Sequence, residues 1–168
     1  ILEDCRIDPT GRHIATMHDK CSLRVWDANE GTELYRVSLT KECARYGLTV
    51  FWTCDMGPFS PSGKYVLLGD ATSIFVWNLE NREVDWSWKS DSRITSFAPS
   101  ADWSLCAIAI ESGSVKIVSM KDSSVVATLR GHESEVDELD WHGTDFLASA
   151  CDGDRTVRVW DLRQRKEV

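Results

Sequence analysis

The sequence lacks the long apolar stretch that a membrane-spanning helix requires. No run approaches the roughly 20 consecutive apolar residues needed to cross a bilayer. The opening residues, ILEDCRIDPTG, have neither the basic nor the apolar region of a signal peptide. An Asn-x-Ser/Thr acceptor for N-glycosylation is also absent. These absences favour an intracellular protein, cytoplasmic or nuclear, that does not work in a membrane.

Basic residues are in the minority. The chain has 19 Lys and Arg against 27 Asp and Glu, which gives a formal net charge of −8. Because phosphate binding depends on clustered Lys and Arg, this excess of acid argues against nucleic acid as the primary partner. The RQRK cluster at residues 163–166 is the one locally basic stretch.

Familiar motifs of catalysis and metal binding are absent too. The six cysteines show no CxxC or other tight ligand spacing, and most lie in apolar, strand-like runs. This favours small buried side chains in a reducing compartment, with zinc ligands or disulfides as the alternatives. GPFSPSGKY, residues 57–65, has five residues between its glycines and Tyr after Lys, where a phosphate-binding loop needs four and Ser or Thr. We therefore predict no catalytic residue, no cofactor and no metal ion.

One ten-residue pattern, by contrast, occurs four times. The copies are SLRVWDANEG (22–31), SIFVWNLENR (73–82), SVKIVSMKDS (114–123) and TVRVWDLRQR (156–165). Their starting positions, 22, 73, 114 and 156, lie 51, 41 and 42 residues apart. Self-similarity at a period in the low forties indicates a repeat architecture. The excess in the first interval falls in TKECARYGLTVFW, residues 40–52, which we interpret as an enlarged connecting loop.

Each repeat predicts four short strands. In the last repeat VDELDW (136–141), FLASAC (146–151) and TVRVWDL (156–162) are rich in β-branched and aromatic residues and are separated by the turn sequences HGTD and DGDR. A fourth strand follows the earlier copies, as in TELYRVSL (32–39). The third strand is apolar at nearly every position, as in IFVW (74–77), so both of its faces should be covered.

Four-stranded sheets at this period, with both faces buried, are typical of the blades of a β-propeller. Here the sequence resembles the WD40-repeat family. The residues that carry the resemblance are the Gly131-His132 pair, the Trp26-Asp27 and Trp160-Asp161 dipeptides and the weaker Trp77-Asn78, whereas the third repeat departs from the pattern with Val118-Ser119. The resemblance implies an all-β fold in which this chain supplies four blades of a larger, seven-bladed ring.

We expect a single partial propeller domain over residues 1–168. The four blades are placed at residues 1–39, 52–88, 93–130 and 136–168, with the inserted loop 40–52 after the first. Such a piece should not close by itself, because its terminal blades expose apolar sheet faces and strand edges. Those surfaces are expected to be covered by the remaining blades of the same protein or by self-association.

The resemblance also implies a structural hydrogen-bond network in the last repeat. By this resemblance, the network residues are His132, Ser149, Asp154 and Trp160. At the equivalent position of the other repeats, the resemblance predicts core residues at Trp26, Trp77 and Val118. Such a network is physically reasonable, because buried Asp and His satisfy each other and the indole N–H finds an acceptor. A catalytic triad is the functional alternative for this His, Asp and Ser set, but the repeat already explains their order.

Two classes of function fit these features. We favour a non-catalytic scaffold for protein–protein interaction, in which rigid blades present loop side chains to partner proteins. The alternative is a propeller-fold enzyme, such as a metal-dependent hydrolase with an acidic site at the central channel. The acidic residues show no metal-ligand spacing.

Acidic residues are concentrated in one segment of the sequence, which suggests a binding site for a partner. Residues 133–154 contain eight acidic residues and no Lys or Arg. By family topology, one face of the ring presents Glu133, Glu135, Asp152 and, from the insert, Arg45, Tyr46 and Trp52. This rim is either a solvated surface that keeps the protein dissolved or the binding site for a basic peptide segment of a partner. In the second case the aromatic residues of the insert would serve as anchors.

Overall fold

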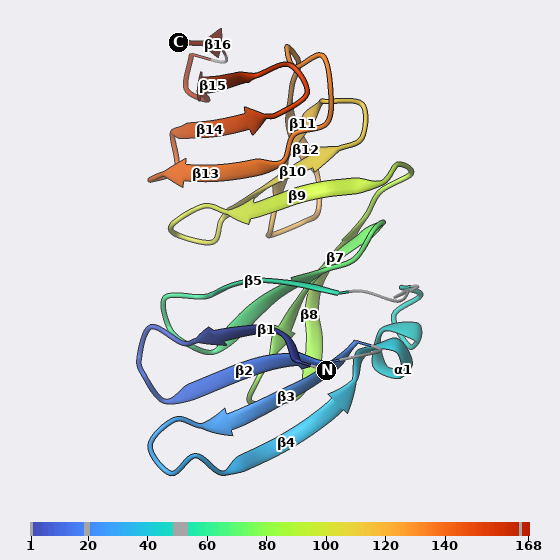
Figure 1. Ribbon diagram of the computed structural model, residues 1–168, viewed down its shortest axis with the longest axis vertical. Helices are drawn as coiled ribbons and strands as arrows, with labels where there is room; N and C mark the ends of the chain where they lie inside the picture. Colours follow the sequence, from blue (N-terminus) through green and yellow to red (C-terminus); the bar gives the residue numbers. More distant parts are fainter. Residues whose placement is uncertain (1, 19–20, 49–53, 165) are drawn as a thin grey trace. The chain divides into compact units, whose positions relative to one another are not determined.

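The computed structural model describes residues 2–18, 21–48, 54–164 and 166–168. These residues form four antiparallel sheets of four strands each and one helix (Figure 1). Within every sheet the strands are hydrogen-bonded in chain order, so each sheet is a meander of hairpins. The predicted all-β fold of four four-stranded units is therefore confirmed. The chain divides into two compact units, residues 1–89 and 90–168, and each holds two sheets.

The first unit contains eight strands and the helix. Its first sheet is β1 (Leu2–Ile7), β2 (His13–His18), β3 (Ser22–Asp27) and β4 (Glu33–Ser38). After α1 (Leu39–Ala44), its second sheet is β5 (Asp55–Phe59), β6 (Tyr65–Gly69), β7 (Ser73–Asn78) and β8 (Glu83–Lys89).

The second unit consists of two further sheets. One is β9 (Ile94–Pro99), β10 (Leu105–Ile110), β11 (Val115–Ser119) and β12 (Val125–Leu129). The other is β13 (Glu138–His142), β14 (Phe146–Cys151), β15 (Thr156–Asp161) and the short β16 (Lys166–Glu167).

The first hairpin turn of three sheets is held by the same kind of cap. A side-chain oxygen at the start of the turn accepts the backbone N–H five residues later. The three bonds are His13 N to Asp8 Oδ2 (2.8 Å), Tyr65 N to Ser60 Oγ (3.1 Å) and Leu105 N to Ser100 Oγ (3.0 Å). Because Asp and Ser side chains satisfy turn amides in this way, a short polar residue at this position sets where each hairpin reverses.

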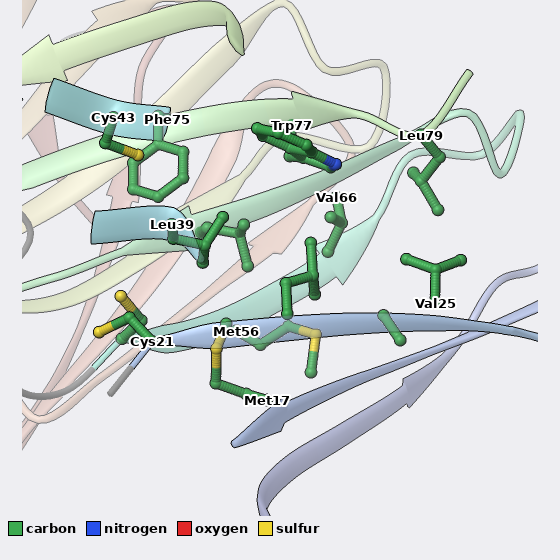
Figure 2. Packing of buried hydrophobic residues seen from close by; sticks show 14 of the residues in the cluster. Met17, Cys21, Val25, Leu39, Cys43, Met56, Val66, Phe75, Trp77 and Leu79 are labelled. Atoms are coloured by element: carbon green, nitrogen blue, oxygen red, sulfur yellow. The ribbon is translucent and has the colours of Figure 1, made fainter. Parts of the chain in front are cut away.

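One hydrophobic core joins the two sheets of the first unit (Figure 2). Leu23 and Val25 of β3 share it with Val66 of β6 and Phe75 of β7, and all four are fully buried. All six residues of β7 are buried, as expected for a third strand that is apolar on both faces. Packing of the two sheets against each other thus covers surface that a single sheet would leave in water.

The insert contains a helix, which the interpretation of residues 40–52 as a loop missed. Helix α1 buries Leu39 and Cys43, and Leu48 follows it into the same core. Figure 2 shows Leu39 and Cys43 among the buried side chains of both sheets. Residues four apart lie on one face of a helix, so the spacing of Leu39 and Cys43 was the available signal. Residues 49–52 of the insert lie outside the described part of the chain.

The second unit has a core of its own, which includes Ala107, Ile117, Leu139, Leu147 and Trp160. Two polar contacts also join its first sheet, one to β13 of the second sheet and one to the loop before β13. The Trp141 indole N–H donates to the Ala98 carbonyl (3.0 Å), and the Thr95 hydroxyl donates to the Val136 carbonyl (2.8 Å).

The expectation that every third strand has two covered faces is wrong for β15. Val157 is 70% exposed and Val159 is 40% exposed. These side chains lie on the opposite face of the strand from Arg158 and Trp160, since successive residues of a strand alternate. Burial of the last sheet is therefore one-sided in this chain.

Truncation of Leu39 to Ala should destabilise the protein by about 2–5 kcal/mol, because it removes a fully buried side chain from the core that α1 shares with both sheets. The midpoint of urea unfolding of the complete protein measures the effect. The matched control is Lys41→Ala on the exposed side of the same helix, which should change stability by less than about 0.5 kcal/mol. Equal effects of the two substitutions would show that the helix is not part of the core.

Candidate functional site

A buried chain of hydrogen bonds crosses the last sheet. The Trp160 indole N–H of β15 donates to Ser149 Oγ of β14 (2.9 Å). Ser149 Oγ lies 2.8 Å from His132 Nε2, and His132 Nδ1 lies 2.8 Å from Asp154 Oδ2. The structure thus brings together the four residues that the family resemblance assigned to a network.

Because Asp154 is ionised, the donor and acceptor of each hydrogen bond in this network can be assigned. A hydrogen bond from the Thr156 hydroxyl, together with bonds from His132 and from the backbone N–H of Glu133, lowers the pKa of Asp154 well below its usual value. An ionised carboxylate only accepts, so His132 Nδ1 carries the proton and Nε2 is left to accept from the Ser149 hydroxyl. The His132 side chain is completely buried, and that of Asp154 is 7% exposed.

His132 and Asp154, together with Cys151, form the one group in the described part of the chain whose ligand atoms are close enough to hold a metal ion. Ligand atoms of His132, Cys151 and Asp154 all lie within 4.8 Å of one another. Both imidazole nitrogens are already hydrogen-bonded, and Cys151 Sγ accepts the backbone N–H of Asp154 at 3.4 Å. A metal ion would have to break bonds that satisfy buried groups, so the arrangement is suited to holding the chain in place rather than to binding an ion.

The network anchors a loop, residues 130–137, beside the turn between β14 and β15. The backbone N–H of Glu133 donates to Asp154 Oδ2 (3.1 Å), and the backbone N–H of Asp152 donates to Asp137 Oδ2 (2.8 Å). At Gly153 the two segments are so close that a Cβ atom there would lie 2.5 Å from Ser134 Oγ. The loop that carries Glu133 and Glu135 therefore packs against the turn that carries Asp152.

A third segment, the turn between β10 and β11, supports the same loop. A Cβ atom at Gly113 would lie 2.4 Å from the Ser134 carbonyl oxygen, so only glycine permits this approach. Together with the segments around it, this loop forms an acidic surface, the acidic rim, which consists of Glu111, Glu133, Glu135, Asp137 and Asp152. All five side chains are exposed or half-buried.

Arg93 is a member of this surface that sequence reasoning missed. Its guanidinium pairs with Glu135 and lies 4.0 Å from Glu111. The count of charges over residues 133–154 could not reveal it, because Arg93 lies about 40 residues earlier in the chain and is brought there by the fold. The acidic rim is therefore less negative than the sequence count suggested.

The insert residues belong to the first unit. Arg45 pairs with Glu42 one helical turn earlier (2.7 Å), and Tyr46 is 43% exposed. Trp52 lies outside the described residues. Whether these side chains share a face with the acidic rim stays a prediction.

In the first two repeats the indole N–H of the corresponding tryptophan finds a different hydrogen-bond acceptor. The Trp77 indole N–H donates to the hydroxyl of Tyr35 (3.3 Å), which reaches across from β4 of the neighbouring sheet. Trp26 donates to Thr16 Oγ1 (2.9 Å), which in turn contacts His18 Nε2 (3.0 Å). Trp77, Val118 and Trp160 are buried, whereas Trp26, also predicted to be a core residue of its repeat, is only partly buried.

Comparison with known proteins decides the family. A model of the WD domain, G-beta repeat, matches residues 123–161. The structure of the RRP9 WD40 repeats superposes with a TM-score of 0.83 over 99% of this chain and 50% of that chain, at 22% identity. The chain belongs to the WD40-repeat β-propeller family. It covers about half of such a propeller, and its four sheets are blades.

Curated relatives agree with this assignment. The WD40 chain is 29% identical to the transcription factor unc-37 of Caenorhabditis elegans over 66% of its length, which is 18% of that protein. It is 28% identical to the nuclear distribution protein PAC1 of Arthroderma benhamiae over 92% of its length, which is 37% of that protein. The chain thus spans well under half of either relative. WD40-repeat proteins are typically scaffolds for protein interaction.

Among the described residues, no helix is long and apolar enough to cross a membrane.

The ionisation of Asp154 predicts a pH dependence of stability. Because the pKa of Asp154 is lower in the folded state than in the unfolded chain, its contribution is fully present above about pH 4 and is lost as the pH falls through the folded value. Asp154→Asn removes this titration. The difference in urea midpoint between wild type and Asp154→Asn should therefore shrink between about pH 5 and about pH 2.

Asp152→Asn provides the control, because within the described part of the chain the Asp152 carboxylate accepts no hydrogen bond. A wild-type advantage over Asp154→Asn that stayed constant across this pH range would contradict the assignment.

Proposed function

We propose that this chain is the partner-binding part of a non-catalytic WD40 scaffold and that its acidic rim receives a basic peptide segment of another protein. The observation that carries the proposal is the close packing of the loop 130–137 against the β14–β15 turn at Gly153. This packing gathers carboxylates from separate segments on one exposed surface.

Rigidity of the carboxylates supports binding. The backbone next to Glu133 is tied to Asp154, and that next to Asp152 is tied to Asp137. Side chains that start from a fixed backbone lose less conformational entropy when a partner binds. Acidic groups held in this way attract Lys and Arg side chains and raise the rate of association at low salt.

Arg93 supports the same chemistry. Its guanidinium lies between Glu135 and Glu111, which shows that the acidic rim accommodates an arginine side chain. Arg and carboxylate groups match each other in a planar, forked geometry. A partner arginine could therefore make contacts of the kind that Arg93 makes.

A structural role of the buried network argues for a scaffold rather than for the alternative of a metal-dependent hydrolase. His132 and Ser149 are satisfied inside the sheet by Asp154 and Trp160, and the imidazole has no exposed surface. A general base must reach the proton that it abstracts from a substrate. The buried thiols fit an intracellular protein: burial raises the pKa of Cys43 to about 12, which keeps that thiol protonated and unreactive.

We also propose that further blades of the same protein complete the ring. The blades are assigned to about residues 1–39, 52–88, 93–130 and 136–168 on the repeat period. Coverage of half of the RRP9 chain supports this proposal.

Charge reversal of the acidic rim tests the proposed function. The triple variant Glu133→Lys, Glu135→Lys and Asp152→Lys, made in the complete protein, should reduce recovery of the partner at low salt at least tenfold. The reason is that attraction becomes repulsion. Pull-down from lysate, with quantitative mass spectrometry at about 50 mM and about 300 mM salt, measures recovery. The wild-type protein should lose much of the same partner at the higher salt concentration.

The matched control reverses Asp122, Asp140 and Asp145, which gives the same change in net charge. Asp122 and Asp145 lie in turns at the other end of the strands, and Asp140 lies within β13. This control should retain the partner. Unchanged recovery with the rim variant at low salt would show that the acidic rim is only a solvated surface.

A further inference from the structure

The first unit contains a polar cavity of about 190 Å³ between three turns at one end of its two sheets. It is lined by Thr10, Arg12 and His13 at the β1–β2 turn, by residues 62–64 of the β5–β6 turn and by residues 79–80 of the β7–β8 turn. The cavity is smaller than the roughly 300–1,000 Å³ pockets that take drug-sized ligands. Its size suits one side chain of a partner rather than a separate small molecule.

Arg12 is the unpaired charge of this cavity. Within the described part of the chain, its guanidinium has no ion-pair partner, whereas Lys64 of the β5–β6 turn is paired with Glu80 (2.9 Å). The Arg12 backbone is fixed on both sides: its N–H donates to Asp8 Oδ1 (3.3 Å), and its carbonyl accepts the N–H of Ala28 (2.9 Å). The cation is therefore exposed on a backbone that does not need to rearrange when a ligand binds.

The Asp8 side chain fixes the conformation of the β1–β2 turn that carries Arg12. Its fully buried side chain contacts His13 Nδ1 at 2.8 Å and accepts the hydroxyl of Thr10 at 2.7 Å. A Cβ atom at Gly63 would lie 3.1 Å from Asp8 Cγ, so the β5–β6 turn packs closely on this carboxylate. Asp8 thereby fixes the turn that carries Arg12 on one side of the cavity.

From this geometry we infer that the cavity binds a carboxylate of a partner protein, with Arg12 as the principal contact. A guanidinium donates two parallel N–H bonds to a carboxylate, and the unpaired Arg12 offers this fork. Phosphate is disfavoured, because Asp8 and Glu80 flank the cavity and repel a doubly charged group more strongly than a singly charged one. This site lies in the first unit and takes the opposite charge from the acidic rim, so it does not depend on the proposed function.

Ligand-observed NMR on the complete protein tests this inference. The probes are capped Gly-Glu-Gly, capped Gly-Gln-Gly and Gly-Gly-Gly with a free carboxyl terminus. Saturation transfer from the protein to the Glu peptide or to the free terminus is expected, with none to the Gln peptide. The responding probe tells whether the carboxylate comes from a side chain or from a chain end.

Two variants and two competing anions make the result decisive. Arg12→Gln should abolish the transfer, whereas Arg6→Gln, which removes an exposed arginine already paired with Asp4, should leave it unchanged. Transfer that persists in Arg12→Gln, or is absent in the wild type, would overturn the inference. Displacement of the peptides by inorganic phosphate at lower concentration than by acetate would overturn the choice of carboxylate over phosphate.

Discussion

The hydrogen-bond chain from Trp160 through Ser149 and His132 to Asp154 is the constraint on which the candidate site depends. It joins Ser149 and Trp160 on two strands of the last sheet to His132 in the loop before it and Asp154 in its last turn. An unpaired buried polar group costs about 1–3 kcal/mol. All four side chains are paired, and the last acceptor, Asp154, extends the chain to the backbone of Glu133. The interior of the blade thus determines where its surface loop lies.

The other repeats meet the same requirement with different residues. A buried tryptophan needs an acceptor for its N–H wherever it packs. Trp77 finds one in Tyr35 of the neighbouring blade, which also donates to the Leu79 carbonyl (3.3 Å) and stacks against Arg82. The bond therefore ties two blades together, whereas the network of the last repeat lies within one blade and its loop. Blades of the same fold therefore differ in which segments their tryptophan hydrogen bonds connect.

The repeat period and the strand patterns predicted the four sheets, because period-two burial and turn residues are local signals. Contacts between residues that lie far apart in the chain give no such local signal in the sequence. Tyr35 lies 42 residues from Trp77, and Arg93 lies 42 residues from Glu135, so nothing in the neighbouring sequence marks either pair. Helix α1 escaped detection because it is only six residues long, too short for an amphipathic period to stand out. The apolar pattern of the third strand could not indicate that Val157 and Val159 are exposed; only the place of this strand in a terminal blade, which was expected to expose an apolar sheet face, pointed that way.

Hydrogen–deuterium exchange of the complete protein tests most directly whether the buried network, rather than general packing, positions the acidic loop. In Asp154→Ala, the account predicts faster exchange confined to residues 131–136 and 151–156, with the protection of strands β9–β12 unchanged. Unaltered exchange of residues 131–136, or an equal loss of protection across all four strands, would contradict it.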